Sequence, residues 1–450
     1  FEPLVGTGTD FSLKPLLAKS WSQTDDKTWE IVLNDGILFH DNTPLTAKAV
    51  KFSLDHATSV NPKVKSMLKY ASSEVVDDKT VKIHTTEANP LLPAFLHYPN
   101  MAIMSENSVD SSGTVTKPIG TGPMVFKSLD PQTKTLTMTK NDKYWKGQVQ
   151  ADGEIIKVIP DPNTRSAAIE NGEYDITFNT PASEITQLKS KGLNVELYDT
   201  PRLLRMDCNM DHPQVADKAV RQAISYAIDR KGLVENVLFN AGTPAVGPYL
   251  TSSPWALSSL KPYAYDPEKA KSLLDEAGWK VGADGIRAKG DQKLELTLIS
   301  SANDAILPSL SEAIAAELKE VGIKVNVELA DYSATEKRMG DGNFDLHFMS
   351  FSTGMVPDPA YIMENWYLST GGSNYARYKN PTVDQMIIEG AKNPDRARAY
   401  DGVQTILNDE LPVIPIIYPK FTMVTGANVK GFVYDPTSHD YRINPETHIE

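Results

Sequence analysis

The residues that could hold a small molecule gather in one stretch of the chain, residues 344–367, FDLHFMSFSTGMVPDPAYIMENWY. A largely apolar run stops there at Ser352-Thr353-Gly354, and Asp358-Pro359 opens a new segment. This order is typical of a buried strand, a loop and the start of a helix. Because ligands of open α/β sheets lie just beyond the carboxyl ends of strands, we expect this loop to form one wall of a ligand site.

Polar and aromatic side chains around the loop are the candidates for ligand contact. Thr353 lies in the loop itself, and Trp366, Tyr367 and Tyr375 follow it. Ligand sites favour aromatic side chains, but protein cores use them too, and each of the three fits either place. His347 stands between two apolar residues of the expected strand. It is expected to be a packed residue of the sheet that lies close to the pocket loop.

Catalytic motifs are missing from the sequence. It contains no Gly-x-Ser-x-Gly elbow, no His-Glu-x-x-His, no Walker loop and no Gly-x-Gly-x-x-Gly. The single cysteine, Cys208, lies within or just after an expected strand, so we expect it to be packed rather than nucleophilic. It cannot form an internal disulfide bond. The sequence therefore shows no motif for catalysis or for a bound cofactor, which argues against an enzyme.

Composition narrows the class of partner. The 450 residues suit two or three domains, and a hydrophobic content of 40% is ordinary for a globular chain. The net charge of −13 disfavours nucleic acid and anionic membrane as main partners. No apolar run is as long as a bilayer crossing. The chain begins without Met, so we expect that an upstream segment has been removed.

Strands that alternate with helices predict a fold of α/β lobes. Asp-Pro pairs open expected helices at 162–170 and 267–277, and apolar spacing predicts helices at 216–228 and 307–320. Residues 1–20 are expected to be helix or turn, with residues 13–21 leading toward a sheet. The Gly/Pro/Ser-rich stretch 241–259 is the candidate for the first crossing between lobes. We expect lobe I at 1–242 plus 424–450, with an inserted subdomain at about 22–150, and lobe II at 243–423.

Short motifs in a fixed order extend over essentially the whole chain: Leu17-Ala18-Lys19-Ser20-Trp21, Pro44-Leu45-Thr46-Ala47, Gly120-Thr121-Gly122-Pro123, Tyr144-Trp145, Ile159-Pro160-Asp161-Pro162, Val220-Arg221-Gln222-Ala223, Ala227-Ile228-Asp229-Arg230, Tyr265-Asp266-Pro267 and Leu411-Pro412-Val413-Ile414-Pro415. Together they resemble the peptide/nickel family, family 5, of solute-binding proteins that serve ABC importers.

The resemblance implies a two-lobed periplasmic-binding-protein-like fold, of class II type in the large cluster C, with an extra subdomain in the first lobe. It implies an extracytoplasmic protein, periplasmic or a cell-surface lipoprotein, that works as a monomer. Such a protein closes around a solute by hinge motion and delivers it to the permease subunits in the membrane. Most signature residues are then structural, and Arg165 and Asp229 are expected to hold their lobe together rather than to contact ligand.

The pocket loop favours the nickel branch of this family. Peptide-binding members typically place an aspartate just after the loop glycine, where it pairs with the ammonium group of the peptide. Here Met355 stands at that position. A thioether cannot neutralise a buried ammonium, and an unpaired buried charge is costly. Asp358 does not replace the aspartate, because it is expected to cap the following helix.

Nickel-branch members bind the metal as a chelate with small organic ligands or free histidine and supply few protein ligands. In one such pattern an arginine follows Leu-Pro after an early strand, where this chain has Asn100, and a pocket tryptophan falls at Met67. Arg202 and Arg205 are the candidates to hold carboxylates instead, because arginine pairs well with carboxylate groups.

His439 is the candidate metal ligand. Residues 431–442 resemble nickel-branch sequences, some of which carry a histidine there, and imidazole suits Ni²⁺. A lone histidine in a loop is otherwise a solvated residue. If His439 binds the metal, acid should weaken nickel binding as the imidazole protonates. His97 and His56 are weaker candidates.

The sequence thus predicts an extracytoplasmic substrate-binding protein of an ABC transporter. Its ligand is expected to be nickel, as a chelate with histidine or a small metallophore. A di- or oligopeptide-binding protein of the same family is the alternative. A receptor or chemosensory role that uses the same bound form stays open beside both.

Overall fold

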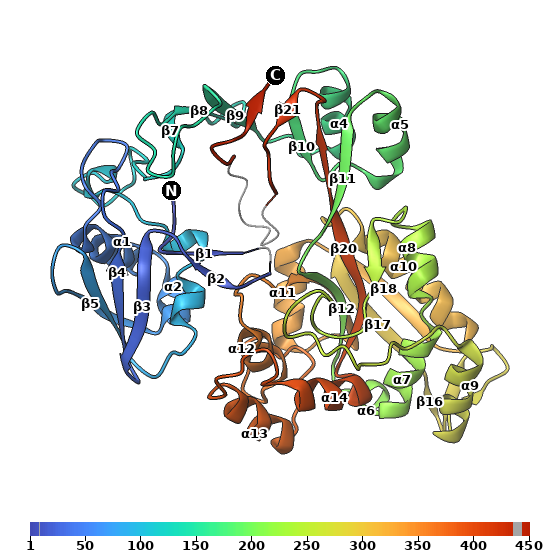
Figure 1. Cartoon of the computed structure of the whole chain (residues 1–450). Helices are drawn as coiled ribbons and strands as arrows, with labels where there is room; N and C mark the ends of the chain where they lie inside the picture. The colour runs from blue at the N-terminus through green and yellow to red at the C-terminus, as the bar shows by residue number, and fades with distance from the viewer. Residues whose placement is uncertain (9, 435–442) are drawn as a thin grey trace. The chain divides into compact units, whose positions relative to one another are not determined.

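The computed structural model divides the chain into two compact units (Figure 1). It describes residues 1–8, 10–434 and 443–450. Unit 1 comprises Phe1–Glu196, Met355–Pro357 and Met423–Glu450, and unit 2 comprises Leu197–Gly354 and Asp358–Thr422. The first crossing between the units therefore follows Glu196, earlier than the expected stretch 241–259. The reason is strand β12 (Arg202–Cys208), which pairs with β19 (Leu346–Ser352) and β20 (Val413–Thr425) in the sheet of unit 2.

Unit 1 contains small antiparallel sheets and short helices. Its main sheet has the strand order β3-β4-β6-β5, and a second one has the order β7-β8-β9. The elements are β1 (Val5–Thr7), β2 (Leu13–Pro15), β3 (Ala18–Asp25), β4 (Thr28–Leu33), α1 (Ala47–Val60), α2 (Pro62–Leu68), β5 (Tyr70–Val75), β6 (Thr80–Thr85), α3 (Leu92–Phe95), η1 (Pro99–Met101), η2 (Glu106–Ser108), β7 (Met124–Asp130), β8 (Thr135–Lys140), β9 (Gly153–Lys157), α4 (Pro162–Glu170), β10 (Ile176–Phe178), η3 (Ala182–Glu184), α5 (Ile185–Ser190), β21 (Val429–Lys430) and β22 (His448–Ile449); β11 (Asn194–Asp199) continues into unit 2.

Helix α1 shows how local sequence builds unit 1. The hydroxyl of Thr46 accepts a hydrogen bond from the amide of Ala49 and so caps the start of the helix. Val50 and Leu54 are fully buried on the side of α1 that packs on β5 and β6. The expectation of a helix or turn at residues 1–20 was wrong, because β1 and β2 pair there through backbone hydrogen bonds. The expectation that residues 13–21 lead toward a sheet was right, since β2 and the start of β3 occupy them.

Unit 2 is an α/β unit around one sheet. The strand order within it is β20-β12-β19-β17-β18, with β13 added on β20. The remaining elements are α6 (Pro213–Ala216), α7 (Lys218–Ala227), α8 (Arg230–Asn236), β13 (Gly242–Pro244), α9 (Pro267–Glu276), β14 (Lys280–Val281), β15 (Arg287–Lys289), β16 (Gln292–Lys293), β17 (Glu295–Ser301), α10 (Leu307–Glu320), β18 (Lys324–Ala330), α11 (Tyr332–Asp341), α12 (Pro359–Ile362), the π-helical turn η4 (Met363–Tyr367), α13 (Pro381–Gly390) and α14 (Asp401–Glu410).

The two faces of this sheet differ in chemistry. β17 is parallel to both β18 and β19, so α10 and α11 are crossover helices of two consecutive βαβ units. One face packs its apolar side chains against α10, among them Leu204, Met206 and Phe348. On the other face Ile299 packs with Met339 of α11. We call this second face the α11 face; because side chains alternate along a strand, it also carries Arg205, Asp207, His347, Met349 and Phe351.

Most signature residues are structural, as expected. The guanidinium of Arg165 donates to four backbone carbonyls, those of Ile159, Pro160, Phe178 and Asn179. Asp229 accepts from the amide of Gly232 and so caps α8. The Asp-Pro helices begin where expected, because Asp161 and Asp266 cap α4 and α9. The helix expected at 216–228 begins later, since Asp217 caps α7.

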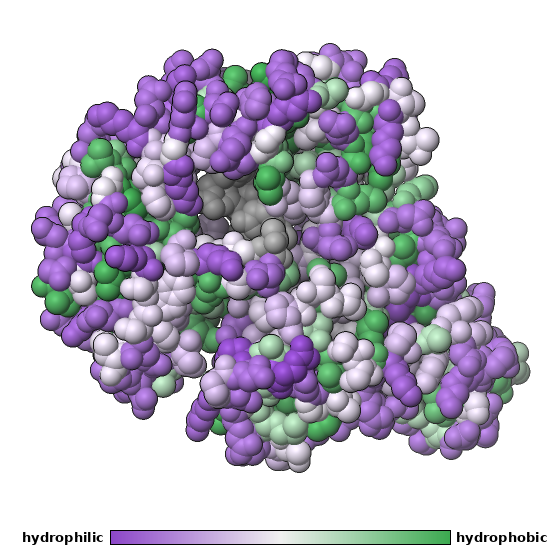
Figure 2. Space-filling model, viewed as in Figure 1, coloured by the Kyte–Doolittle hydropathy of each residue, from purple (hydrophilic) through white to green (hydrophobic). Residues whose placement is uncertain are grey.

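The visible surface is mostly hydrophilic, with apolar residues in small groups (Figure 2). No helix of the described ranges is long and apolar enough to cross a membrane.

Cys208 is fully buried in β12, and burial raises the pKa of its thiol to about 12. Because the thiolate is the reactive form, we expect the native protein at pH 8 to react with a thiol reagent at least about 100-fold more slowly than the urea-unfolded chain. Mass spectrometry of timed samples measures this, with Cys208→Ser as the unlabelled control. Equal rates in both states would show that β12 opens readily.

Glu317 on α10 is half-buried, and burial, with Asp229 nearby, raises the pKa of its carboxyl to about 7. The folded state then holds the proton of Glu317 more tightly than the unfolded chain does. The contribution of this carboxyl to the free energy of unfolding is therefore fully present below pH 4.5 and falls as pH rises toward 7. Glu317→Gln should therefore stabilise the protein by about 1 kcal/mol at pH 8, after allowance for solvent screening, and by little at pH 5. Urea unfolding at both pH values, with exposed Glu312→Gln on the same helix as control, tests this. An equal effect at both pH values would contradict it.

Candidate functional site

The loop after β19 is anchored by its neighbours. Asp358 caps α12 by accepting from the amide of Ala360, as expected, and its carboxylate also pairs with Arg396 through contacts of 2.5 and 3.0 Å. The Thr353 hydroxyl is buried and donates to the carbonyl of Pro201 at 2.9 Å. Met355 is half-buried. Asp358 is therefore engaged with protein groups.

The two arginines of β12 lie on opposite faces of the strand, because their positions differ by an odd number. Arg202 is half-buried and donates to the Ser350 hydroxyl at 3.2 Å. Arg205 is on the α11 face and is fully buried, with an exposed fraction of 0%. The two arginines therefore do not lie on the same face of the sheet, and only Arg205 is fully buried.

Aromatic rings surround the Arg205 guanidinium. Its central carbon lies 3.5 Å from the ring centroid of Trp366 and 5.7 Å from that of Phe351. Such stacking stabilises a desolvated guanidinium. Trp366 is itself 1% exposed and lies in the π-helical turn η4, a distortion that is frequent at functional sites.

Arg205 keeps hydrogen-bonding capacity that the protein does not use. Its Nη2 lies 3.6 Å from the sulfur of Met349 and 3.4 Å from Oδ1 of Asp207. Its Nε and Nη1 have no hydrogen-bond partner among the described residues, and neither does the indole nitrogen of Trp366. Buried polar groups are almost always paired. These unused donors are what an enclosed carboxylate would need.

A second charged residue extends this cluster along the sheet. Asp207 is 1% exposed, and its Oδ2 lies 3.2 Å from Nδ1 of His347, which stands directly opposite on β19. His347 is buried and meets the ring of Tyr375 edge-on at 6.2 Å. His347 is thus a packed sheet residue near the candidate pocket, as expected. Asp207 was missed from the sequence, where the signal was a second charge two positions after Arg205 in an apolar strand.

A small pocket adjoins the cluster on the same face of the sheet. Leu203, two residues before Arg205, lines it, and so does Pro415, which lies opposite Arg205 on β20. Tyr367 of η4, next to Trp366, lines it too. Of the predicted residues, Trp366 stacks on Arg205, and Tyr375 contacts His347, which is linked to Arg205 through Asp207.

The other predicted residues lie elsewhere in the chain. Met67, half-buried in α2, and Asn100, exposed in η1, belong to unit 1. His97 is buried, and His56 stacks on Phe52. His439 lies outside the described residues. Within the described ranges, no group of three or more His, Cys, Asp or Glu side chains is placed to hold a metal ion.

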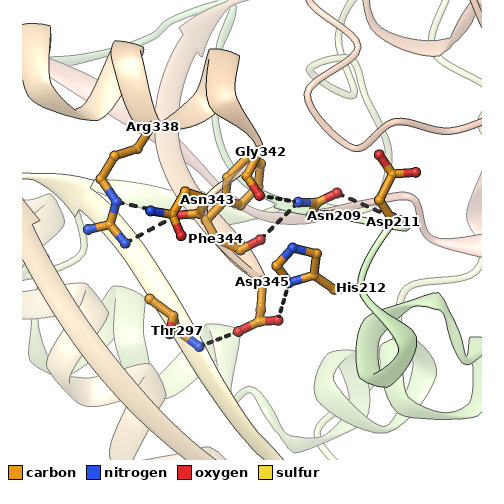
Figure 3. A network of polar contacts seen from close by, with 9 residues as sticks. All are labelled: Asn209, Asp211, His212, Thr297, Arg338, Gly342, Asn343, Phe344 and Asp345. Carbon is orange, nitrogen blue, oxygen red and sulfur yellow. Dashed lines mark hydrogen bonds and ion pairs between the residues drawn. The ribbon is translucent and has the colours of Figure 1, made fainter.

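A separate polar network joins the ends of β12, β17 and β19 (Figure 3). Asp345 accepts from the amide of Thr297 at 2.7 Å and lies 2.8 Å from Nδ1 of His212. The Asn209 side chain donates to two backbone carbonyls of the turn that follows α11. These contacts hold strand ends together, so Asp345 is a structural carboxylate and a natural control for Asp207.

The fold has two compact units, and unit 2 encloses an arginine with unused hydrogen-bond donors. The model of the bacterial extracellular solute-binding proteins, family 5, matches residues 12–374, and the chain belongs to this family.

Relatives and solved structures in the family bind different solutes. The chain is 28% identical to the nickel-binding periplasmic protein of Escherichia coli K12 (97% of this chain, 87% of the relative) and 30% identical to the glutathione-binding protein GsiB of the same strain (96% and 86%). NikA from Brucella suis in complex with Fe(III)-EDTA is similar in structure, with a TM-score of 0.89, 28% identity and coverage of 100% and 94%. NikZ from Campylobacter jejuni in complex with Ni(L-His) has a TM-score of 0.78, 26% identity and coverage of 96% and 89%.

Proposed function

We propose that this chain is the extracytoplasmic substrate-binding protein of an ABC importer that captures nickel as a chelate, with histidine or a small metallophore, and delivers it to the permease. The observation that carries the proposal is Arg205, a fully buried cation whose Nε and Nη1 have no partner among the described residues. A chelator that binds nickel through carboxylates offers the acceptors that these donors need. Met355 in the pocket loop and the nickel-binding relative support nickel over peptide.

The other residues predicted to contact the ligand have the following roles in this proposal. Trp366 and Tyr375 form the aromatic wall, and Thr353 and Met355 belong to the loop. Met67, Asn100 and Arg202 stay weaker candidates for ligand contact. His439 is proposed as the metal ligand, and a His439→Ala protein that binds nickel–histidine unchanged would remove it from the site.

A peptide ligand is the second candidate, because GsiB is a glutathione-binding protein and glutathione is itself a tripeptide. Thermal unfolding separates the two, since only a bound ligand stabilises the folded state. We expect Ni²⁺ with excess L-histidine to raise Tm by several degrees, and Ni²⁺ alone, L-histidine alone, glutathione and a dipeptide mixture to leave it nearly unchanged. A shift with glutathione or dipeptides but none with nickel–histidine would favour the alternative.

A further inference from the structure

Two opposite charges on the α11 face each keep an unused hydrogen-bonding atom. Arg205 has Nε and Nη1 without partners in the described part of the chain, and Asp207 has Oδ1 in the same condition apart from its ion-pair contact at 3.4 Å to Arg205 Nη2. Both side chains are at most 1% exposed. The pair is therefore neutral as a whole, yet it offers donors and an acceptor side by side.

The neighbouring side chains do not use Nε and Nη1 of Arg205 or Oδ1 of Asp207 for hydrogen bonds. His347 occupies the other oxygen of Asp207 at 3.2 Å, and Met349 and Asp207 share Nη2 of Arg205. Trp366 covers the guanidinium at 3.5 Å. Nε and Nη1 belong to different edges of the guanidinium, so each edge retains an unused N–H. His347 acts as a positioning residue, because it fixes which oxygen of Asp207 stays available.

A pair of this kind fits a ligand that carries a carboxylate and an N–H donor close together. In an α-amino acid a single carbon separates the carboxylate from the amino group, so both can reach one compact site. Oδ1 of Asp207 lies 3.4 Å from Nη2 of the same guanidinium whose Nε and Nη1 are unused. A ligand with carboxylates alone would leave Oδ1 of Asp207 unpaired and add negative charge beside it, which is unfavourable in a buried site.

We propose that Arg205 and Asp207 together recognise an α-amino acid unit of the chelator, with its carboxylate on Arg205 and its amino group donating to Asp207. This inference rests on the proposed function and deepens it: the chelator is an amino acid such as histidine, and Asp207 is the residue that selects it over chelators that lack an N–H donor. A metal-bound amine still carries N–H donors, so nickel coordination leaves the contact with Asp207 intact.

A matched pair of ligands tests the inference. Nα,Nα-dimethyl-L-histidine keeps the carboxylate, the imidazole with its ring N–H and the amine nitrogen, but its amine carries no N–H donor once it binds nickel through that nitrogen. Calorimetry would compare the nickel complexes of L-histidine and of this analogue on the wild-type protein, Asp207→Asn and Asp345→Asn. We expect a preference for L-histidine of at least about tenfold in the wild type and in Asp345→Asn, and of less than about threefold in Asp207→Asn.

The outcomes separate the two proposals. A wild-type protein that binds both nickel complexes equally overturns the inference without any variant and leaves the nickel function standing. A folded Asp207→Asn protein that keeps the full preference overturns it too. A wild-type protein that binds neither nickel complex overturns the proposed function, and the inference about a nickel chelator with it.

Discussion

An Arg205→Met, Asp207→Asn double variant is expected to keep its fold and to lose at least about 100-fold in affinity for nickel–histidine. The double change removes both buried charges at once, and replacing a complete buried pair by neutral groups of similar size is often close to neutral for stability. Arg205→Met alone should cost about 3–5 kcal/mol of unfolding free energy, because Asp207 then stays buried without its cation. Urea unfolding and ligand titration of both variants measure the two effects.

Measuring both stability and ligand affinity in these variants separates a structural role of Arg205 from a role in binding. Arg205→Lys keeps the charge but loses the planar donor set and the stacking on Trp366, so we expect it to weaken binding by roughly tenfold or more. A double variant that binds nickel–histidine as tightly as the wild type would show that Arg205 only supports the fold.

The second large effect is expected at Glu2, a buried carboxylate at the start of unit 1. Glu2 is 1% exposed and accepts hydrogen bonds from Thr121, Tyr144 and Trp145 at 2.8, 2.8 and 2.9 Å. Glu2→Ala would remove the acceptor of three hydrogen bonds and the carboxylate that lies 3.9 Å from Lys146. We expect a loss of about 3–5 kcal/mol in unfolding free energy, measured by urea unfolding.

The control for Glu2 lies in the same unit. Glu106 pairs with Lys48 at 3.2 Å, but both side chains are largely exposed, so Glu106→Ala should change stability by less than about 1 kcal/mol. Equal losses of unfolding free energy in Glu2→Ala and Glu106→Ala would contradict this account, in which the hydrogen bonds from Thr121, Tyr144 and Trp145 to the Glu2 carboxylate stabilise unit 1.

Where side-chain chemistry acts locally, the sequence predicted the fold well. Caps by Thr46, Asp161 and Asp266 set helix starts, because each side chain bonds an amide within its own first turn. Helix α11 was not predicted, although Asp331 caps it and Gly342, at a positive φ of 72°, ends it. Its exposed, polar residues hide the apolar periodicity on which the prediction relied.

Long-range pairing explains the rest of the differences. The residues 1–20 form strands because their partners are backbone groups, and side-chain pattern says little about such pairing. The crossing after Glu196 depends on the pairing of β12 with β19 and β20, more than 130 positions further along the chain. The Arg205–Asp207–His347 cluster depends on the same register, so the sequence could propose Arg205 and place His347 near the loop, but it could not show that Asp207 joins them.

The central claim is that the protein binds a nickel chelate, and isothermal titration of the purified apo protein with Ni²⁺, with and without excess L-histidine, tests it most directly. We predict saturable heat at a stoichiometry of one complex per chain only when both Ni²⁺ and L-histidine are present. Heat from small peptides or glutathione, with none from nickel and histidine, would contradict the claim and place the protein among the peptide binders of its family.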